Sequence, residues 1–261
     1  MKKLSLKKIY VFFSSMFIFA LHLPFVFAKS MSVEKPGINP LLKPALAKNV
    51  ATAEPGSFNI YDSLRLGTLG LARQAFDYAF KGFTYLKSIG KIENPYILSI
   101  VDFTRPSSEK RLFVIDIKNM QLLFNTYVAH GANSGKEFAR YFSNSMQSNK
   151  SSLGFFETEN TYTGKNGYSL HLEGLEKGIN DNAYRREIVM HGAEYVNEDM
   201  IRTKGYIGRS WGCPAIPENV HVSIIDKIKN GSCLFIFGQD KNYVKHSRIL
   251  KEAGAPVLVN S

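Results

Sequence analysis

A succession of short runs rich in β-branched and aromatic residues constrains the fold most strongly, because such runs favour strands. Strands are expected at 96–103, 111–117, 121–129, 153–162, 168–175, 187–192 and 233–238. The three-residue break at 118–120 predicts a hairpin. A short helix is expected at 218–229, with Gly231 suited to end it. The pattern predicts a mainly β or α+β domain over 95–238.

Residues 57–94 predict a helical element packed on that domain. Apolar side chains recur at three- and four-residue steps from Leu69 to Leu86, which is helical spacing with one buried face. Gly67 and Gly70 weaken its start, so two helices with a break are expected. The proline-rich segment 29–56 is expected to be a linker, and 239–261 a C-terminal tail.

Residues 1–28 have the pattern of a secretory signal peptide. A basic start is followed by an apolar run and by Ala28, a small residue suited to cleavage. The alternative is an uncleaved membrane anchor, but His22 and Pro24 interrupt the run. We expect an exported protein with no membrane span after cleavage, located in the periplasm or cell envelope or secreted.

The formal net charge of +11 suits an anionic cell-envelope polymer, although solubility alone also explains it. We find no aromatic-basic motif and no lysine-rich run, so nucleic acid is not an expected partner. We expect a monomer.

The two cysteines lie in different contexts. Cys233 opens an apolar strand, whereas Cys213 lies in a turn rich in glycine and proline. An even cysteine count in an exported protein also allows a disulfide between them. Buried free cysteines are common in cores, so we favour two free thiols.

Cys213 has the surroundings of a nucleophile. Gly212 removes a side chain next to it, so that a substrate carbonyl can approach, and Pro214 fixes the exit of the turn. The amides of Gly212 and Cys213 are candidate donors to an oxyanion. A purely structural cysteine in a turn is the alternative.

His191 is the candidate base that would deprotonate the thiol. It ends the apolar run 188–190 and is followed by Gly192. A base needs an orienting partner on its other nitrogen, and either a carbonyl near Gly192 or the Ser210 hydroxyl can serve. A packed structural histidine is the alternative.

Three further residues are candidate substrate contacts. Arg209 can bind a substrate carboxylate or be an ordinary surface charge. Trp211 can line an acyl pocket or close the core beneath the turn. His130 follows another strand-like run, and a substrate contact, a supporting role and a loop anchor stay open for it. Zinc bound by histidine and cysteine lacks the usual short ligand spacing, so no metal is expected.

The sequence resembles the murein L,D-transpeptidase catalytic-domain family of bacterial cell-wall enzymes. The resemblance covers about 96–238 and is carried by VDFTRPSSEKRLFVIDI, VAHGANSG, SSLGFFETENTYTGKNGYSLHLEGLEKGINDNA and GRSWGCPAIP, together with His191-Gly192. It implies a mixed β-sheet catalytic domain and peptidoglycan stem peptides as partners. It also implies acyl transfer through Cys213 and His191, acylation by carbapenems and no cofactor. The acceptor stays open: a stem amine, a lipoprotein, a D-amino acid or water.

The sequence departs from the wider family at three places. Trp211 replaces a basic residue, Pro214-Ala215 replaces an aliphatic residue followed by Arg or Asn, and the long gap from His191 to Cys213 implies an inserted loop around 195–204. Two other hypotheses remain: another exported cysteine hydrolase, either a peptidase or an amidase, and a non-catalytic module that binds the cell wall.

Overall fold

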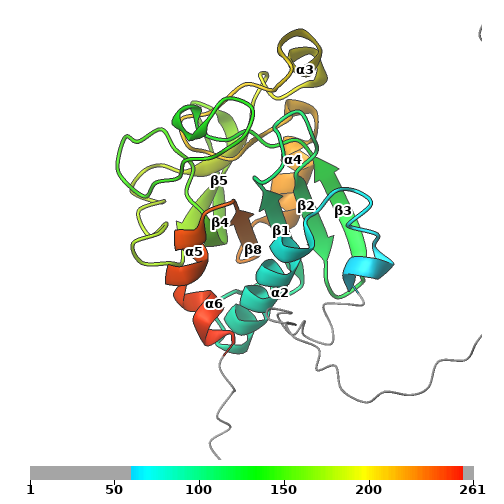
Figure 1. The fold of residues 1–261 in the computed structure, drawn as a ribbon, viewed down its shortest axis with the longest axis vertical. Helices are drawn as coiled ribbons and strands as arrows, with labels where there is room; N and C mark the ends of the chain where they lie inside the picture. Colours follow the sequence, from blue (N-terminus) through cyan, green and yellow to red (C-terminus); the bar gives the residue numbers. More distant parts are fainter. Residues whose placement is uncertain (1–59, 255–261) are drawn as a thin grey trace, which may run out of the picture. The chain divides into compact units, whose positions relative to one another are not determined.

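The computed structural model describes residues 60–254, which contain one mixed eight-stranded sheet (Figure 1). The strands are β1 (Ile97–Asp102), β2 (Leu112–Asp116), β3 (Gln121–Thr126), β4 (Gly154–Gly164), β5 (Gly167–Gly174), β6 (Val189–Gly192), β7 (Ala215–Ile216) and β8 (Cys233–Phe237). Their order across the sheet is β3-β2-β1-β8-β4-β5-β6-β7. The pairs β1–β8 and β6–β7 are parallel, and the others are antiparallel. The predicted fold class, a mixed β-sheet domain with helices, is confirmed.

Five named helices accompany the sheet in this part of the chain: α2 (Arg73–Ser88), α3 (Glu198–Lys204), α4 (Glu218–Ile228), α5 (Lys241–His246) and α6 (Arg248–Glu252). The predicted break in the N-terminal helical element is present, because turns cover 64–70 between a helical stretch at 60–63 and α2. The α2 helix buries Phe76, Phe83 and Leu86 as expected. Leu69, which was expected on the buried face, is 39% exposed because it lies in the turns before α2.

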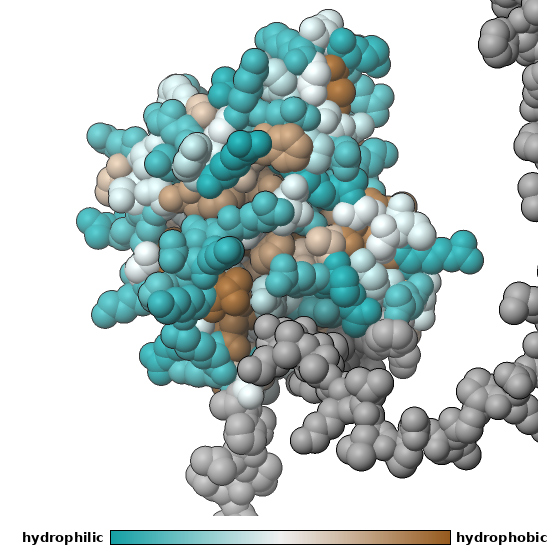
Figure 2. Space-filling model, in the orientation of Figure 1, coloured by the Kyte–Doolittle hydropathy of each residue, from teal (hydrophilic) through white to brown (hydrophobic). Residues whose placement is uncertain are grey.

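The core lies around the central strands, since every residue of β1, β2 and β8 is buried. The α2 helix packs on β1 and β8, and α4 packs on β6 and β5 (Figure 1). Gly82 of α2 lies directly over the Phe155 ring, where a Cβ would come within 2.0 Å. On the face drawn in Figure 2, hydrophobic side chains reach the surface in a band across the middle, bordered by hydrophilic ones.

Three segments differ from the sequence expectations. The short strand β7 was not predicted, because two residues are too few for a periodic signal. The inserted loop around 195–204 contains α3, which Asn197 caps by accepting the Met200 amide. The expected tail 239–261 contains α5 and α6, and Tyr243 and Leu250 are buried. The predicted signal (1–28) and linker (29–56) lie outside the described residues.

Candidate active site

Ser210 closes the turn that carries Cys213. Its Oγ donates to the Cys213 carbonyl oxygen at 2.6 Å and accepts the Gly212 amide at 3.1 Å. Gly212 has a φ of +127°, and a Cβ there would lie 2.9 Å from the carbonyl oxygen of Lys150. The turn therefore requires glycine for both its conformation and its space.

The thiol of Cys213 faces the chain just before β6. Its Sγ donates to the carbonyl oxygen of Glu187 at 3.6 Å. Burial raises the pKa of the Cys213 thiol, while hydrogen bonds from the backbone amides of Val189 and Cys213 and the positive charge of Arg186 oppose that rise in part. A thiol with a raised pKa keeps its proton at neutral pH, so a base is needed to activate it.

His191 lies in β6 and is buried. Its Nδ1 lies 2.8 Å from the carbonyl oxygen of Gly192. A carbonyl only accepts, so Nδ1 carries the proton and Nε2 keeps a free lone pair. Burial lowers the pKa of His191, the Gly192 carbonyl raises it in part, and His221 lowers it again. The imidazole is therefore neutral at pH 7 and equipped to accept a proton.

The strand register places the two candidates on adjacent segments of the chain. His191 of β6 pairs with Ala215 of β7, which lies two residues after Cys213. Val189, two residues before His191, directs its backbone amide at the thiol. The nucleophile and base candidates thus lie on neighbouring parallel segments. Of the two orienting partners considered for the base, the Gly192 carbonyl is the one bonded, and Ser210 serves the nucleophile turn instead.

The amide of Gly212 does not serve as the expected oxyanion donor in this structure. It is buried and already donates to Ser210 Oγ. The backbone N–H of Cys213 lowers the pKa of the residue's own thiol in part, so this amide stays the candidate oxyanion donor of the two. The sequence placed both amides in the turn, but only the structure shows that the Gly212 amide is directed at the Ser210 side chain.

Of the three roles considered for His130, a direct substrate contact does not fit this structure, because its side chain is fully buried. Its Nδ1 accepts from Arg111 Nη2 at 2.8 Å, and its Nε2 donates to the Gly135 carbonyl oxygen at 3.2 Å. Burial, together with the charge of Arg111, lowers the pKa of His130 to about 3. Both nitrogens are therefore engaged inside the protein, which fits the loop anchor among the three roles considered.

Arg209 and Trp211 flank Ser210 at the surface. Arg209 is exposed, and its Nη1 donates to the carbonyl oxygens of Ala132 and Gly135 at 3.3 and 3.2 Å. One end of its guanidinium therefore holds the 132–135 loop. Trp211 is 76% exposed, which excludes the alternative that it closes the core.

Sequence reasoning missed Arg186, which lies beside the thiol. Its guanidinium donates to four oxygens of the segment 143–152: the carbonyls of Ser143 and Lys150 and the hydroxyls of Ser148 and Ser152. It also lies 3.3 Å from the position that a Gly212 Cβ would take. Nothing in the sequence distinguishes it from its neighbour Arg185.

Tyr195 and His221 were also missed. Burial, together with the nearby Cys213, raises the pKa of Tyr195 to about 12. His221 of α4 packs against Gly192, where a Cβ would lie 2.7 Å from the imidazole. Both come from segments that carry no sequence signal for a site, the inserted loop and an amphipathic helix.

Both cysteines are free, so the disulfide alternative is not formed. Cys233 is fully buried in β8. Between residues 60 and 254, no three side chains of His, Cys, Asp or Glu are grouped as a metal site. Over the same residues, none of the helices has the length and apolar character that crossing a bilayer requires.

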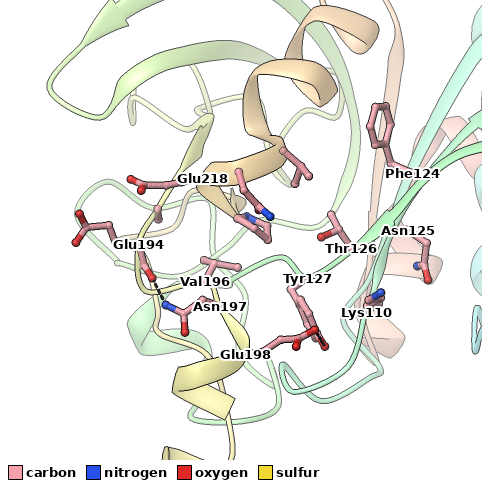
Figure 3. Close-up of a pocket in the computed structure, with 14 residues that line it drawn as sticks. Lys110, Phe124, Asn125, Thr126, Tyr127, Glu194, Val196, Asn197, Glu198 and Glu218 are labelled. Atoms are coloured by element: carbon pink, nitrogen blue, oxygen red, sulfur yellow. Dashed lines mark hydrogen bonds between the residues drawn. The ribbon is translucent and has the colours of Figure 1, made fainter. Parts of the chain in front are cut away.

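A pocket of about 610 Å³ opens where β6 and β7 end (Figure 3). The loops that follow these strands line it, together with the end of β3 and the start of α4. Tyr127 donates to Glu198 across it at 3.3 Å. Glu194, Glu198 and Glu218 bring negative charge to its lining, and Lys110 brings positive charge. Neither Cys213 nor His191 lines this pocket.

The model of one protein family, described as L,D-transpeptidase catalytic domain, matches residues 68–237. Among curated proteins, none matches this chain. Solved structures that match this chain include three bacterial proteins. An L,D-transpeptidase from Mycobacterium smegmatis is 11% identical, with a TM-score of 0.34, over 55% of this chain and 59% of its own.

The helical cell shape determining protein Pgp2 (K307A mutant) from Campylobacter jejuni is 12% identical, with a TM-score of 0.38, over 66% of this chain and 60% of its own. An L,D-transpeptidase from Stackebrandtia nassauensis is 15% identical, with a TM-score of 0.33, over 65% of this chain and 69% of its own. The matched part thus spans less than two thirds of the M. smegmatis and C. jejuni chains.

Proposed function

Because the chain belongs to the L,D-transpeptidase catalytic domain family, we propose that it is an exported enzyme that remodels peptidoglycan through an acyl-enzyme on Cys213. One observation carries the proposal. The Cys213 thiol is protonated, and the His191 imidazole is neutral with a free Nε2. The two residues lie on neighbouring segments, because His191 pairs with Ala215, two residues after Cys213. Their protonation states are those of a nucleophile that needs a base and of a base that can act.

The reaction would proceed in two acyl transfers. His191 Nε2 takes the Sγ proton of Cys213 while the sulfur attacks the carbonyl of the third residue, a diamino acid, in a tetrapeptide stem. The C–N bond to the terminal D-alanine breaks, and His191 returns the proton to the leaving amine. A second amine then attacks the thioester, forming a cross-link and restoring the thiol. Water in place of the amine would make the enzyme an L,D-carboxypeptidase.

Arg186 would favour the negative charge that develops at the thiol and the attacked carbonyl. Its four bonds to the 143–152 segment hold the guanidinium in place, so it need not reorganise during the reaction. Trp211, exposed two residues before the nucleophile, would form a wall of the substrate site.

Intact-mass measurement under reducing conditions tests the proposal. The mature protein is incubated with a disaccharide-tetrapeptide and, separately, with a carbapenem. An adduct is expected on the wild type, and none on Cys213→Ser. Cys233→Ser is the matched control, because its thiol is buried in β8 and should leave the adduct unchanged. A folded wild type that forms no adduct with either compound would overturn the proposed chemistry.

Two further assays separate the other functions considered. A general cysteine hydrolase would cleave ordinary L,L-peptides, and a wall-binding module would bind sacculi equally well with Cys213→Ala. Export rests on residues 1–28, so sequencing the N-terminus of protein recovered from the cell envelope tests it. A mature chain that begins near residue 29 supports export, and an intact Met1 in the cytoplasm contradicts it.

A further inference from the structure

Three aromatic side chains form a row on the surface between β4 and the chain before β6. The rings of Tyr162 and His171 stack with centroids 4.4 Å apart and planes at 18°. Tyr184 continues the row with its centroid 5.6 Å from that of His171. Tyr162 is 36% exposed and Tyr184 is 60% exposed. We call these three residues the aromatic row.

The aromatic row lies on the same face of the sheet as the candidate base. Residues directly opposite each other in an antiparallel pair project to one face. His191 lies opposite Ser169, and Ser169 lies opposite Tyr162. His171 lies opposite Val189, which has the same parity as His191 along β6. The rings therefore stand on the face that carries His191.

The row also lies at a defined distance from the nucleophile. The Val189 amide contacts the Cys213 thiol, and Val189 pairs with His171 on the next strand. Two strand spacings of about 4.8 Å place His171, the middle of the row, roughly 10 Å from the nucleophile, and Tyr162 lies one strand further on β4. A stem of three residues, extended at about 3.3–3.6 Å each, spans roughly the same length. When the third carbonyl of a stem reaches Cys213, the sugar that carries the stem can therefore lie on the row.

The chemistry of the row fits a sugar better than a charged or fully apolar ligand. Large rings left open to water form an amphipathic surface with apolar faces and polar edges. A pyranose ring presents a flat C–H face to such rings and hydroxyl groups to their edges. Rings that served only the β4–β5 hairpin would be expected to bury more of their surface.

We propose that the aromatic row of Tyr162, His171 and Tyr184 binds the amino-sugar backbone of a peptidoglycan strand and aligns its stem with Cys213. This inference rests on the proposed function, and it names the glycan as the part of the substrate that the β4–β5 side of the site recognises. The sugar packs across the row, and the stem runs over β5 and β6 toward the thiol.

A binding experiment on the full chain tests the row without needing any reaction. Chitotetraose, a soluble oligomer of N-acetylglucosamine, is titrated into the Cys213→Ser protein and followed by calorimetry. Tyr184→Ala and Tyr162→Ala should each weaken binding by about tenfold, the effect of losing one good aromatic contact. Tyr184→Phe keeps the ring and should keep the affinity.

Tyr96→Ala is the matched control, because Tyr96 is also an exposed tyrosine, 46% exposed, but lies just before β1. Thermal melting of each variant checks that the fold is retained. No binding of chitotetraose to the parent protein, or equal binding by Tyr184→Ala and Tyr96→Ala, would overturn the inference.

A kinetic experiment links the row to the reaction. Tyr184→Ala should raise KM for a disaccharide-tetrapeptide by about tenfold and leave KM for the free tetrapeptide unchanged. An equal change in both KM values would overturn the role in aligning the glycan. Failure of the proposed function is distinguishable, because it would abolish adduct formation on Cys213 while leaving chitotetraose binding dependent on the row.

Discussion

The Sγ of Cys213 donates a hydrogen bond to the main-chain oxygen of Glu187, 3.6 Å away. Glu187 has a φ of +55°, a left-handed conformation that is uncommon for a residue other than glycine. The surrounding turn stabilises it, because the next residue, Ile188, donates to the Ala183 carbonyl at 3.0 Å. Burial raises the pKa of the Cys213 thiol, and the Glu187 carbonyl accepts its proton, so a separate base is needed to activate the sulfur.

We predict that the acylation rate of the wild type, measured by intact mass with a carbapenem, is nearly constant between pH 7 and 8. Burial keeps the pKa of His191 below its ordinary value, so the base is already neutral there. The rate should fall only as the pH drops through that lowered pKa, where the imidazole takes up a proton and can no longer accept one.

His191→Ala should slow acylation by about two to four decades. Its residual rate should then follow the thiolate fraction and rise about tenfold per pH unit, because the pKa of the Cys213 thiol is raised. His246→Ala, in the exposed last turn of α5, is the control and should match the wild type. A flat profile in His191→Ala would contradict the role of this residue as the base.

Ser210→Ala should reduce both stability and acylation. The substitution removes the acceptor of the buried Gly212 amide and the donor to the Cys213 carbonyl. An unsatisfied buried amide costs about 1–3 kcal/mol, which urea denaturation can measure. Ser210→Thr keeps the hydroxyl and should recover most of the loss. Equal stability of Ser210→Ala and the wild type would show that the turn closes without this side chain.

Gly212→Ala should be more destabilising than a glycine substitution that changes conformation alone. The alanine would have to keep a positive φ, and its Cβ would also lie 2.9 Å from the carbonyl oxygen of Lys150. Gly178→Ala is the matched control, because Gly178 has a φ of +79° with open space around it. The free energy of unfolding of the control should fall by about 1–2 kcal/mol, because alanine disfavours its backbone conformation. A Gly212→Ala loss no larger than that of the control would contradict the crowding.

His130 should make the protein sensitive to acid. Its pKa is about 3 in the folded protein, because of burial and Arg111, and about 6.5 in an unfolded chain. As the pH falls below 6.5, the unfolded state binds a proton at this residue and the folded state does not. The free energy of unfolding should therefore decrease by about 1.4 kcal/mol per pH unit from this residue until the pH approaches 3.

Urea denaturation of the wild type and of His130→Gln at pH 7, 5.5 and 4.5 checks this contribution. Glutamine can accept from Arg111 and donate to Gly135 but does not titrate, so the difference between the two proteins isolates the imidazole. The stability of the wild type should fall more steeply with decreasing pH than that of the variant. If the stabilities of the two proteins fell equally with decreasing pH, the pKa of His130 would not be lowered by folding, and this prediction would be wrong.

Most strands and the two longer helices could be predicted because each carries a repeated local signal. The β-branched runs around β1 and β2 and the apolar face of α2 are examples. The strand β7 and the helices α5 and α6 are too short for such a signal, and their positions depend on contacts with distant segments. Leu69 fits the apolar spacing of the helix, but it lies in a turn. The next residue, Gly70, has a φ of +90°, which is not helical, so α2 begins only after it.

By itself, the sequence determined which groups are available for chemistry: a thiol after a glycine, a histidine at the end of a strand and a serine two residues before that glycine. Only the tertiary structure decided how each group is used. It buried His130 beside Arg111, engaged the Gly212 amide with Ser210, and set Arg186 next to the thiol. The reason is physical, because pKa and hydrogen-bond direction depend on burial and on partners distant in the chain, and a local pattern records neither.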